Sequence, residues 1–284
     1  MRGSHRFTIL AIGLIALIGS HVADASIVIS IIGDKAKADI SLPGPGATTY
    51  DSDFELQFDN PLNLSVACLG LDADVLDAGE IAAITARLPD PVNMVIDPAF
   101  PVRVTVEPPA GCGLAFDNEV DVQWRSINLI WSAGSPYRLM KAPVSGAFRD
   151  ITGEVSAGSV RVRGSTGGFS EFVFIKDLNP DYTPEATALY TQLNARLADP
   201  ALSATVKAVL QMDANLSRAA FLAGNYGAAI AVLADFDQHA ADLVGDETLP
   251  NRWRSQRDLI DHEGELISLS DALKFTLGRL NGAP

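Results

Sequence analysis

The hydrophobic period of the sequence changes once, near residues 178–183, and this change constrains the fold more than any other feature. Before it, apolar and polar residues alternate in short runs, as in residues 102–106 (VRVTV). After it, apolar residues recur every three to four positions, as at Ile230, Leu233 and Phe236. Alternation is typical of strands with one buried face, and the longer period is typical of amphipathic helices. The sequence therefore predicts an α+β fold whose strands and helices occupy separate regions.

Residues 26–177 are predicted to form an antiparallel β-sandwich domain. Turns rich in proline and glycine, such as residues 43–46 and 164–168, divide the alternating runs at intervals of about 8–12 residues. Short strands joined by such turns are typical of a sandwich or a barrel. Residues 76–87 fit a short helix as well as a strand.

Residues 184–284 are predicted to form an antiparallel helical bundle, joined to the strands by a linker at residues 178–183. Prolines at helix starts and glycines at helix ends divide the region into successive helices with short connections. The last helix is expected to cover residues 249–280, with Trp253 and Leu259 in its apolar seam. Because the period changes at the linker, we expect the two regions to be separate domains.

Residues 1–25 have the three parts of a secretory signal peptide. Arg2 and Arg6 supply positive charge, residues 7–18 are almost entirely apolar, and the segment ends in Ala-Asp-Ala. We expect the chain to be exported, to the periplasm or out of the cell, and to begin at Ser26 after cleavage. No later segment reaches about 18 uninterrupted apolar residues, so no membrane span is expected.

The formal net charge of −14, from 21 basic and 35 acidic residues, argues against nucleic acid as a partner. Histidine is scarce: of the four in the chain, His5 and His21 belong to the expected signal peptide. His239 and His262 remain, and both fall in the predicted helices. The predicted sandwich therefore has no histidine to serve as general base or metal ligand.

The chain has two cysteines, Cys68 and Cys112, and both fall in the predicted sandwich. In an exported protein a pair of cysteines most often forms a disulfide, which we therefore predict between these two residues. The alternative is a pair of buried free thiols.

An acidic stretch supplies the candidate metal site. Asp72, Asp74, Asp77 and Glu80 lie close together in the sequence, and Gly79 falls among them. Calcium binds to many oxygen ligands, which an acidic loop containing a glycine can provide. The spacing departs from that of an EF-hand loop, so the alternative is an acidic loop exposed to solvent.

Three aromatic residues, Trp131, Tyr137 and Phe148, are candidates for a platform on which sugar rings stack. The alternative is that they fill the core of the sandwich, which is the more frequent role of such residues. A glycosidase can work with two carboxylates and no histidine, but the acidic residues here are too numerous to single out a pair.

The helical region resembles a known type of module. Residues 225–229 (NYGAA), 233–236 (LADF) and 264–267 (GELI) are similar to segments of the FIMAH domains, small helical modules attached to secreted bacterial hydrolases. The resemblance covers residues 184–281. It implies a non-catalytic accessory bundle.

These observations together favour an exported, non-catalytic binding or structural module whose partner is a protein or a polysaccharide. One alternative is a carboxylate-dependent hydrolase that acts on an extracellular polymer, which a groove with two facing carboxylates would favour. Another is a calcium-stabilised adhesion module, which depends on the acidic stretch described above. No resident cofactor is expected other than calcium.

Overall fold

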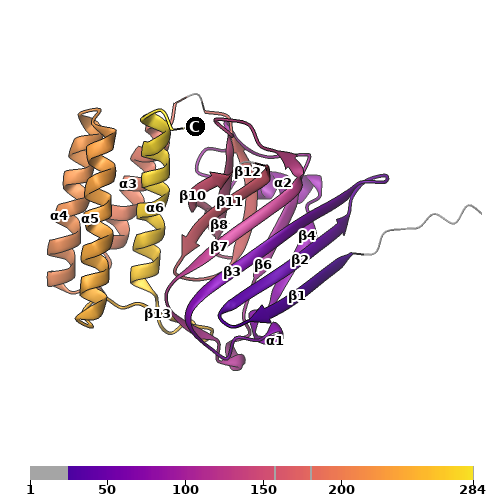
Figure 1. Cartoon of the computed structure of the whole chain (residues 1–284), viewed down its shortest axis with the longest axis horizontal. Coiled ribbons are helices and arrows are strands. Elements are labelled where there is room, and N and C mark those ends of the chain that lie inside the picture. Colours follow the sequence, from indigo (N-terminus) through magenta and orange to yellow (C-terminus); the bar gives the residue numbers. More distant parts are fainter. Residues whose placement is uncertain (1–24, 157, 180, 284) are drawn as a thin grey trace, which may run out of the picture.

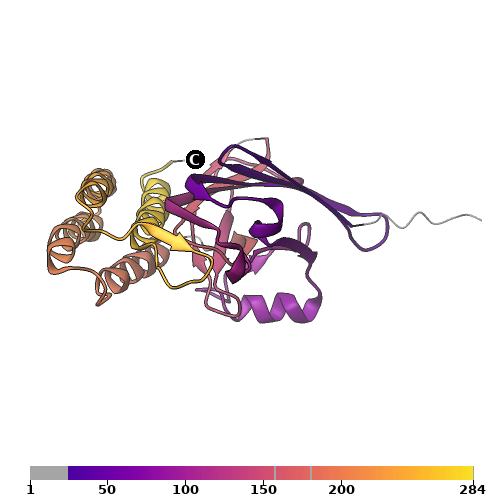
Figure 2. The same ribbon diagram turned by 90° about the horizontal axis from the view of Figure 1, so that it is seen from below.

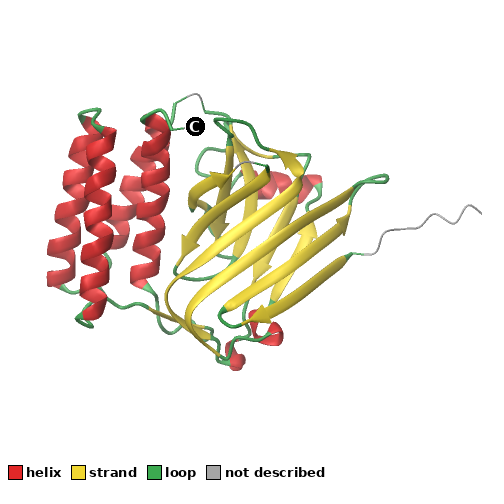
Figure 3. Cartoon of the chain, in the orientation of Figure 1, coloured by secondary structure: helices red, strands yellow, loops and turns green. Residues whose placement is uncertain are grey.

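The computed structural model describes residues 25–156, 158–179 and 181–283. It shows a mixed α+β protein in which antiparallel sheets precede the main helices, as predicted (Figures 1 and 3). The predicted signal peptide, except for Ala25, lies outside the described residues. Among those residues, none of the helices combines the length and the apolar character needed to cross a membrane.

The first sheet contains the long strands of the sheet region. Its strands lie in the order β1-β2-β3-β7-β11-β10, all antiparallel, and β13 pairs with the beginning of β7. The strands are β1 (Ser26–Ile32), β2 (Lys35–Pro43), β3 (Thr49–Leu62), β7 (Ala115–Ile130), β10 (Thr152–Ser156), β11 (Ser159–Thr166) and β13 (Arg252–Arg254).

The second sheet has the strand order β4-β6-β12-β8-β9, again antiparallel, and β5 pairs with β12. Its strands are β4 (Leu71–Val75), β5 (Met94–Ile96), β6 (Val102–Val106), β8 (Tyr137–Ala142), β9 (Arg149–Asp150) and β12 (Glu171–Asp177). Two short helices, α1 (Val66–Leu69) and α2 (Ala78–Thr85), and the 3-10 helix Ala110–Cys112 connect strands.

The two sheets face each other across a common apolar core. Alternating residues of β3 and β7, such as Phe54 and Trp124, point inward because successive side chains of a strand leave on opposite faces. Phe172 and Phe174 of β12 meet them from the second sheet, and the ring centroids of Trp124 and Phe174 are 4.7 Å apart. The alternation read from the sequence therefore marks the face of each strand that enters this core.

Strands β8 and β12 are buried on both faces. The outward side chains of Met140, Val173 and Ile175 form a second apolar cluster, which α2 covers with Ile84. Of the two structures considered for residues 76–87, the helix is the one observed. Asp77 caps α2, because its side chain accepts a hydrogen bond from the backbone N–H of Glu80.

The helical region consists of α3 (Thr183–Leu197), α4 (Ala204–Leu222), α5 (Tyr226–Gly245) and α6 (His262–Leu280). The prediction of a last helix from residue 249 is wrong, because residues 249–261 leave the helices and run along the sheet. There β13 pairs with β7, and Trp253 stacks on Phe116 at a centroid distance of 5.2 Å. The indole ring is only 8% exposed there, because it packs against Phe116 and Phe169.

Helix α6 lies between the other helices and the sheets (Figure 1), and Figure 2 shows the helices end-on beside the sheets. One side of α6, with Leu266, Leu269 and Leu273, belongs to the apolar cluster of the helices. The opposite side is small or polar: Gly264 packs closely against Gly167, between β11 and β12. Each region therefore has its own apolar core, and the junction between them is polar.

Candidate functional site

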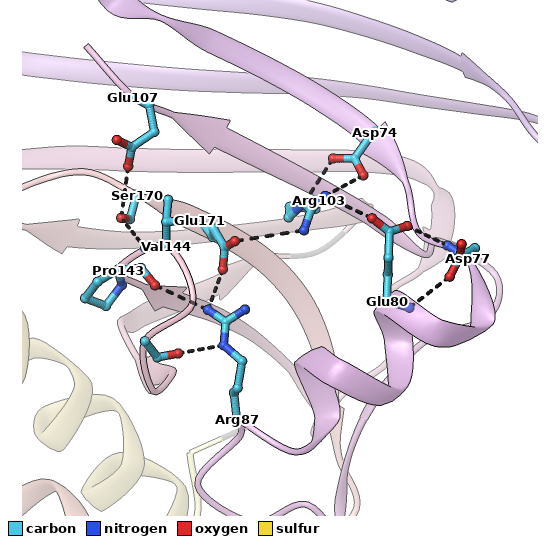
Figure 4. Close-up of polar contacts among 11 residues, drawn as sticks. Asp74, Asp77, Glu80, Arg87, Arg103, Glu107, Pro143, Val144, Ser170 and Glu171 are labelled. Atoms are coloured by element: carbon cyan, nitrogen blue, oxygen red, sulfur yellow. Dashed lines mark hydrogen bonds and ion pairs between the residues drawn. The ribbon is translucent and has the colours of Figure 1, made fainter. Parts of the chain in front are cut away.

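The predicted calcium residues have partners within the chain. Asp77 and Glu80 form a reciprocal cap at the start of α2: Asp77 Oδ1 accepts from the N–H of Glu80 at 2.8 Å, and Glu80 Oε2 accepts from the N–H of Asp77 at 3.0 Å. Asp74, on β4, accepts two hydrogen bonds from Arg103, at 3.0 and 2.8 Å (Figure 4). Asp72 accepts from the N–H of Ala73.

Within the described ranges, no three His, Cys, Asp or Glu side chains are grouped so that they could hold a metal ion. A calcium ion at the acidic stretch would have to displace Arg103, whose guanidinium also lies 3.2 Å from Glu80 Oε1. The calcium loop stays a prediction, without support from the geometry.

The two cysteines lie side by side. Cys68 is in α1 and Cys112 ends the 3-10 helix that follows β6, and both are half-buried. The Sγ of Cys68 is 3.4 Å from the carbonyl oxygen of Cys112, and the Sγ of Cys112 is 3.5 Å from that of Cys68. In the structure the two thiols are free. The disulfide therefore remains a prediction, for residues that lie close together.

We expect mild oxidation of the purified protein to join Cys68 to Cys112. Closing a loop of this length should raise the free energy of unfolding by at most about 4 kcal/mol, because the unfolded chain loses conformational freedom. Alkylation of the denatured protein with and without reductant, followed by intact-mass measurement, counts the free thiols. Two alkylated cysteines in the oxidised but unreduced sample would show that the bond does not form.

The three aromatic residues proposed as a platform do not share an exposed face. Tyr137, on β8, is 6% exposed, and its hydroxyl donates to Asp97 at 2.8 Å. Phe148 lies in the separate cluster under α2, with the guanidinium of Arg87 4.6 Å from its ring centroid. Trp131 packs against the core between the sheets. The burial of Tyr137 and Phe148 favours the alternative for these two residues, and the platform stays a prediction without support from the geometry.

The structure instead shows a cleft of about 700 Å³ where the sheets meet the helices. We call it the basic cleft, because four basic residues and only one acidic residue are among the described residues that line it. The charged lining residues are Lys141, Arg149, Arg196, Arg257 and Glu265, and apolar lining residues include Val144, Phe169, Trp253, Leu259 and Ile260. Clefts at the junction of two structural regions are frequent ligand sites.

One carboxylate lies at the centre of these charges. Glu265, in the first turn of α6, accepts from Lys141 Nζ at 2.9 Å, from Arg149 at 3.1 Å and from Arg196 at 3.2 Å. Burial by itself raises the pKa of Glu265, but the charges of Arg149, Lys141 and Arg196 outweigh it and hold that pKa well below its usual range. Burial lowers the pKa of Lys141 to about 8, with Arg149 adding to the shift and Glu265 opposing it.

Each cation comes from a different element. Lys141 is on β8, Arg149 is on β9 and also donates to Ser268 Oγ at 2.9 Å, and Arg196 is in the last turn of α3. Sequence reasoning missed this group because its members are far apart in the chain. One signal was present: Lys141 follows three strand positions of which two are apolar, and a charge at a buried strand position needs a partner.

A chain of ion pairs, drawn in Figure 4, leads to the loop after β8. Pro143 and Val144 of that loop line the basic cleft. Arg103 and Arg87 both contact Glu171, so that the acidic stretch is connected to the loop after β8. Arg87 donates to the carbonyl oxygens of Pro143, at 3.2 Å, and Gly146, at 2.7 Å. These bonds hold the loop in place along the cleft.

Two facing antiparallel sheets, a helical region with its own core and a charged cleft between them define a mixed α+β protein with a candidate binding site at the junction. The chain belongs to the DUF6689 family, a family of unknown function, whose model matches residues 13–281. A search of the curated proteins found no match to the chain. The matched range includes sheets and helices together, so the resemblance of residues 184–281 to FIMAH domains gains no support from it.

Proposed function

We propose that this protein is an exported, non-catalytic binding module whose basic cleft takes an anionic ligand. The observation that carries the proposal is the charge of the cleft: four basic residues and one acidic residue line it in the described part of a chain whose net charge is −14. A local concentration of opposite charge attracts an anionic partner and orients it. Arginine suits this role because its planar group can pair with a carboxylate through two hydrogen bonds.

The ligand class that fits the cleft best is an acidic polysaccharide. Val144, Leu259 and Ile260 line the cleft beside the basic residues, and each is exposed. Apolar side chains can pack against the carbon face of a sugar ring while arginines bind its carboxylates. Export, proposed from residues 1–25, would bring the protein to such polymers outside the cytoplasm.

The proposed architecture is a β-sandwich domain, residues 26–177, followed by a helical bundle domain from which β13 and Trp253 reach back to the sheets. Two observations support this division: the apolar clusters of the two regions are separate, and the contacts of α6 with the sheets are polar. A polar interface is typical of two domains that each have their own apolar core.

The test is a titration of the purified protein with polygalacturonate, with neutral dextran as the control polymer. We expect saturable binding to the polyanion, and an Arg196→Gln variant should bind about tenfold more weakly because one charged hydrogen-bond donor is lost. Arg196 is half-buried and reaches the cleft from α3, so glutamine can replace it without opening a core.

The matched control is Arg163→Gln, because Arg163 lies away from the basic cleft in an exposed pair with Glu154. Equal affinity of the two variants would contradict the assignment of the cleft. Release of reducing ends from the polymer during the titration would instead identify the protein as a hydrolase.

A further inference from the structure

A second cleft, of about 570 Å³, lies between the first sheet and helices α5 and α6. We call it the acidic cleft, because the charged groups that line it within the described residues are all carboxylates. They come from β3, β7 and α6, and apolar residues of β3 and α5 complete the wall: Asp59, Glu119, Asp121 and Glu263, with Phe58, Ala241 and Val244. Its charge is thus opposite to that of the basic cleft.

Glu263 is the key residue of the acidic cleft. It is 6% exposed, and its Oε2 accepts a hydrogen bond from none of the residues that the structure describes. A buried carboxylate oxygen without a donor is costly unless something binds to it. The acidic cleft therefore holds an unsatisfied acceptor next to a space large enough for a small molecule.

The charges around Glu263 are overwhelmingly negative. Glu119 faces it from β7, Asp59 from β3, Asp237 from α5 and Asp271 from α6 itself, and burial together with these charges raises its pKa to about 8. Asp261, just before α6, is also close.

The described cations near these carboxylates are already paired. Lys274 contacts both Asp237, at 2.5 Å, and Asp271, at 2.8 Å. Arg163 approaches Asp121 from β11 but bonds to Glu154 and Gln123. The negative charge at the mouth of the acidic cleft is thus only partly balanced by positive charge.

We propose that the acidic cleft binds a small organic polycation of the polyamine class. The carboxylates are spread along the cleft, and no three of them within the described ranges are grouped to hold one metal ion. A polyamine matches that spread, because methylene spacers separate its ammonium groups. The spacers can pack on the apolar side chains of Ala241 and Val244 on α5, while each ammonium group donates to a carboxylate.

In this arrangement one ammonium group donates to the carboxylate of Glu263, and the others to Glu119 and Asp121. An ammonium group binds the ionised carboxylate better than the neutral acid, so binding shifts Glu263 toward its ionised form. Near neutral pH the group is mostly protonated, since its pKa is about 8. Polyamine binding therefore releases a proton from Glu263 to the solvent.

The experiment is calorimetric titration of the purified protein with spermidine, in buffers of different ionisation enthalpy. We expect one saturable site, an observed enthalpy that depends on the buffer, and binding about tenfold weaker in a Glu263→Gln variant. The buffer dependence should also become smaller in that variant, because burial raises the pKa values of Glu119 and Asp121 too and these groups can still release protons. Because Glu263 is mostly protonated near neutral pH, the neutral amide closely matches it in shape and charge. The variant should therefore keep its fold, which circular dichroism checks.

The matched control is Asp258→Asn, the same acid-to-amide change at an exposed residue that pairs with Arg254 outside the acidic cleft and should leave spermidine binding unchanged. Equal weakening in both variants would reduce the effect to general screening of an acidic protein and overturn the proposal. Calcium ions that displace spermidine at concentrations below that of the amine would overturn it as well, since they would identify a metal site.

Discussion

Replacing Glu265 with glutamine should lower the free energy of unfolding by about 3–5 kcal/mol at neutral pH. The variant keeps the shape of the side chain but leaves Lys141, Arg149 and Arg196 facing one another without their common counter charge. Lys141 is buried, so water cannot compensate for the lost carboxylate. Urea denaturation of the two proteins, followed by circular dichroism, measures the difference.

The same substitution at Glu154 is the control, and it should change stability by less than about 1 kcal/mol. Its side chain is 51% exposed and that of its partner Arg163 is 48% exposed, so both ions stay hydrated without the pair. A loss of similar size in the two variants would show that the buried cluster has no special importance for folding.

The Glu265 effect should also depend on pH. Because the pKa of Glu265 is lowered in the folded state, its contribution to stability is present above about pH 4.3, the pKa of a glutamate in the unfolded chain. That contribution is lost as the pH falls further through the folded-state pKa. The difference between wild type and Glu265→Gln should therefore be full at neutral pH and smaller at about pH 3.

Replacing Arg138 with methionine should also lower the free energy of unfolding by about 3–5 kcal/mol. Arg138, on β8, is fully buried between three carboxylates: Asp150 and Glu185 lie 3.7 Å from its guanidinium, and Asp177 lies 3.8 Å from it. Methionine fills a similar volume but removes the positive charge that these carboxylates share. Thermal and urea unfolding of the variant measure the loss.

Arg163→Met is the matched control, because it makes the same change at an exposed position of the neighbouring sheet and should shift stability by less than about 1 kcal/mol. Acid should partly rescue Arg138→Met. Burial and the charge of Asp150 raise the pKa of Glu185 already with Arg138 present, and removing the arginine strengthens that shift. A carboxyl with a raised folded-state pKa makes folding more favourable as the pH falls through that value, so the loss should shrink below neutral pH.

The sequence predicted the main elements because their periods reflect local burial. Val102, Val104 and Val106 alternate with polar residues and enter the core between the sheets, as expected. The spacing of Ile230, Leu233 and Phe236 marked α5, which begins at Tyr226, where the side chain of Asn225 accepts from the N–H of Ala228. Such signals are contained within a few residues, so they can be read without knowledge of the partner elements.

The errors arose where distant segments compete for the same residues. Trp253 has the spacing of a helix seam, but its position is decided by Phe116 and Phe169 in the sheets. Tyr137 and Phe148 were candidates for an exposed platform, but both are buried in the structure. Tyr137 lies in the core between the sheets, and Phe148 lies in the cluster that α2 covers. A local sequence pattern does not show which distant residues a side chain will contact in the folded protein.

The sequence by itself determined that most strands precede the main helices and that the chain is acidic. It also showed that candidate metal ligands, such as Asp72 and Asp74, lie close together along the chain. Only the tertiary structure decided the two clefts, because Lys141, Arg149 and Arg196 meet Glu265 from four separate elements. The same holds for Glu119 and Glu263 in the acidic cleft. Burial and charge act over distance in space, so the chemistry of both clefts arises only when α6 docks against the sheets.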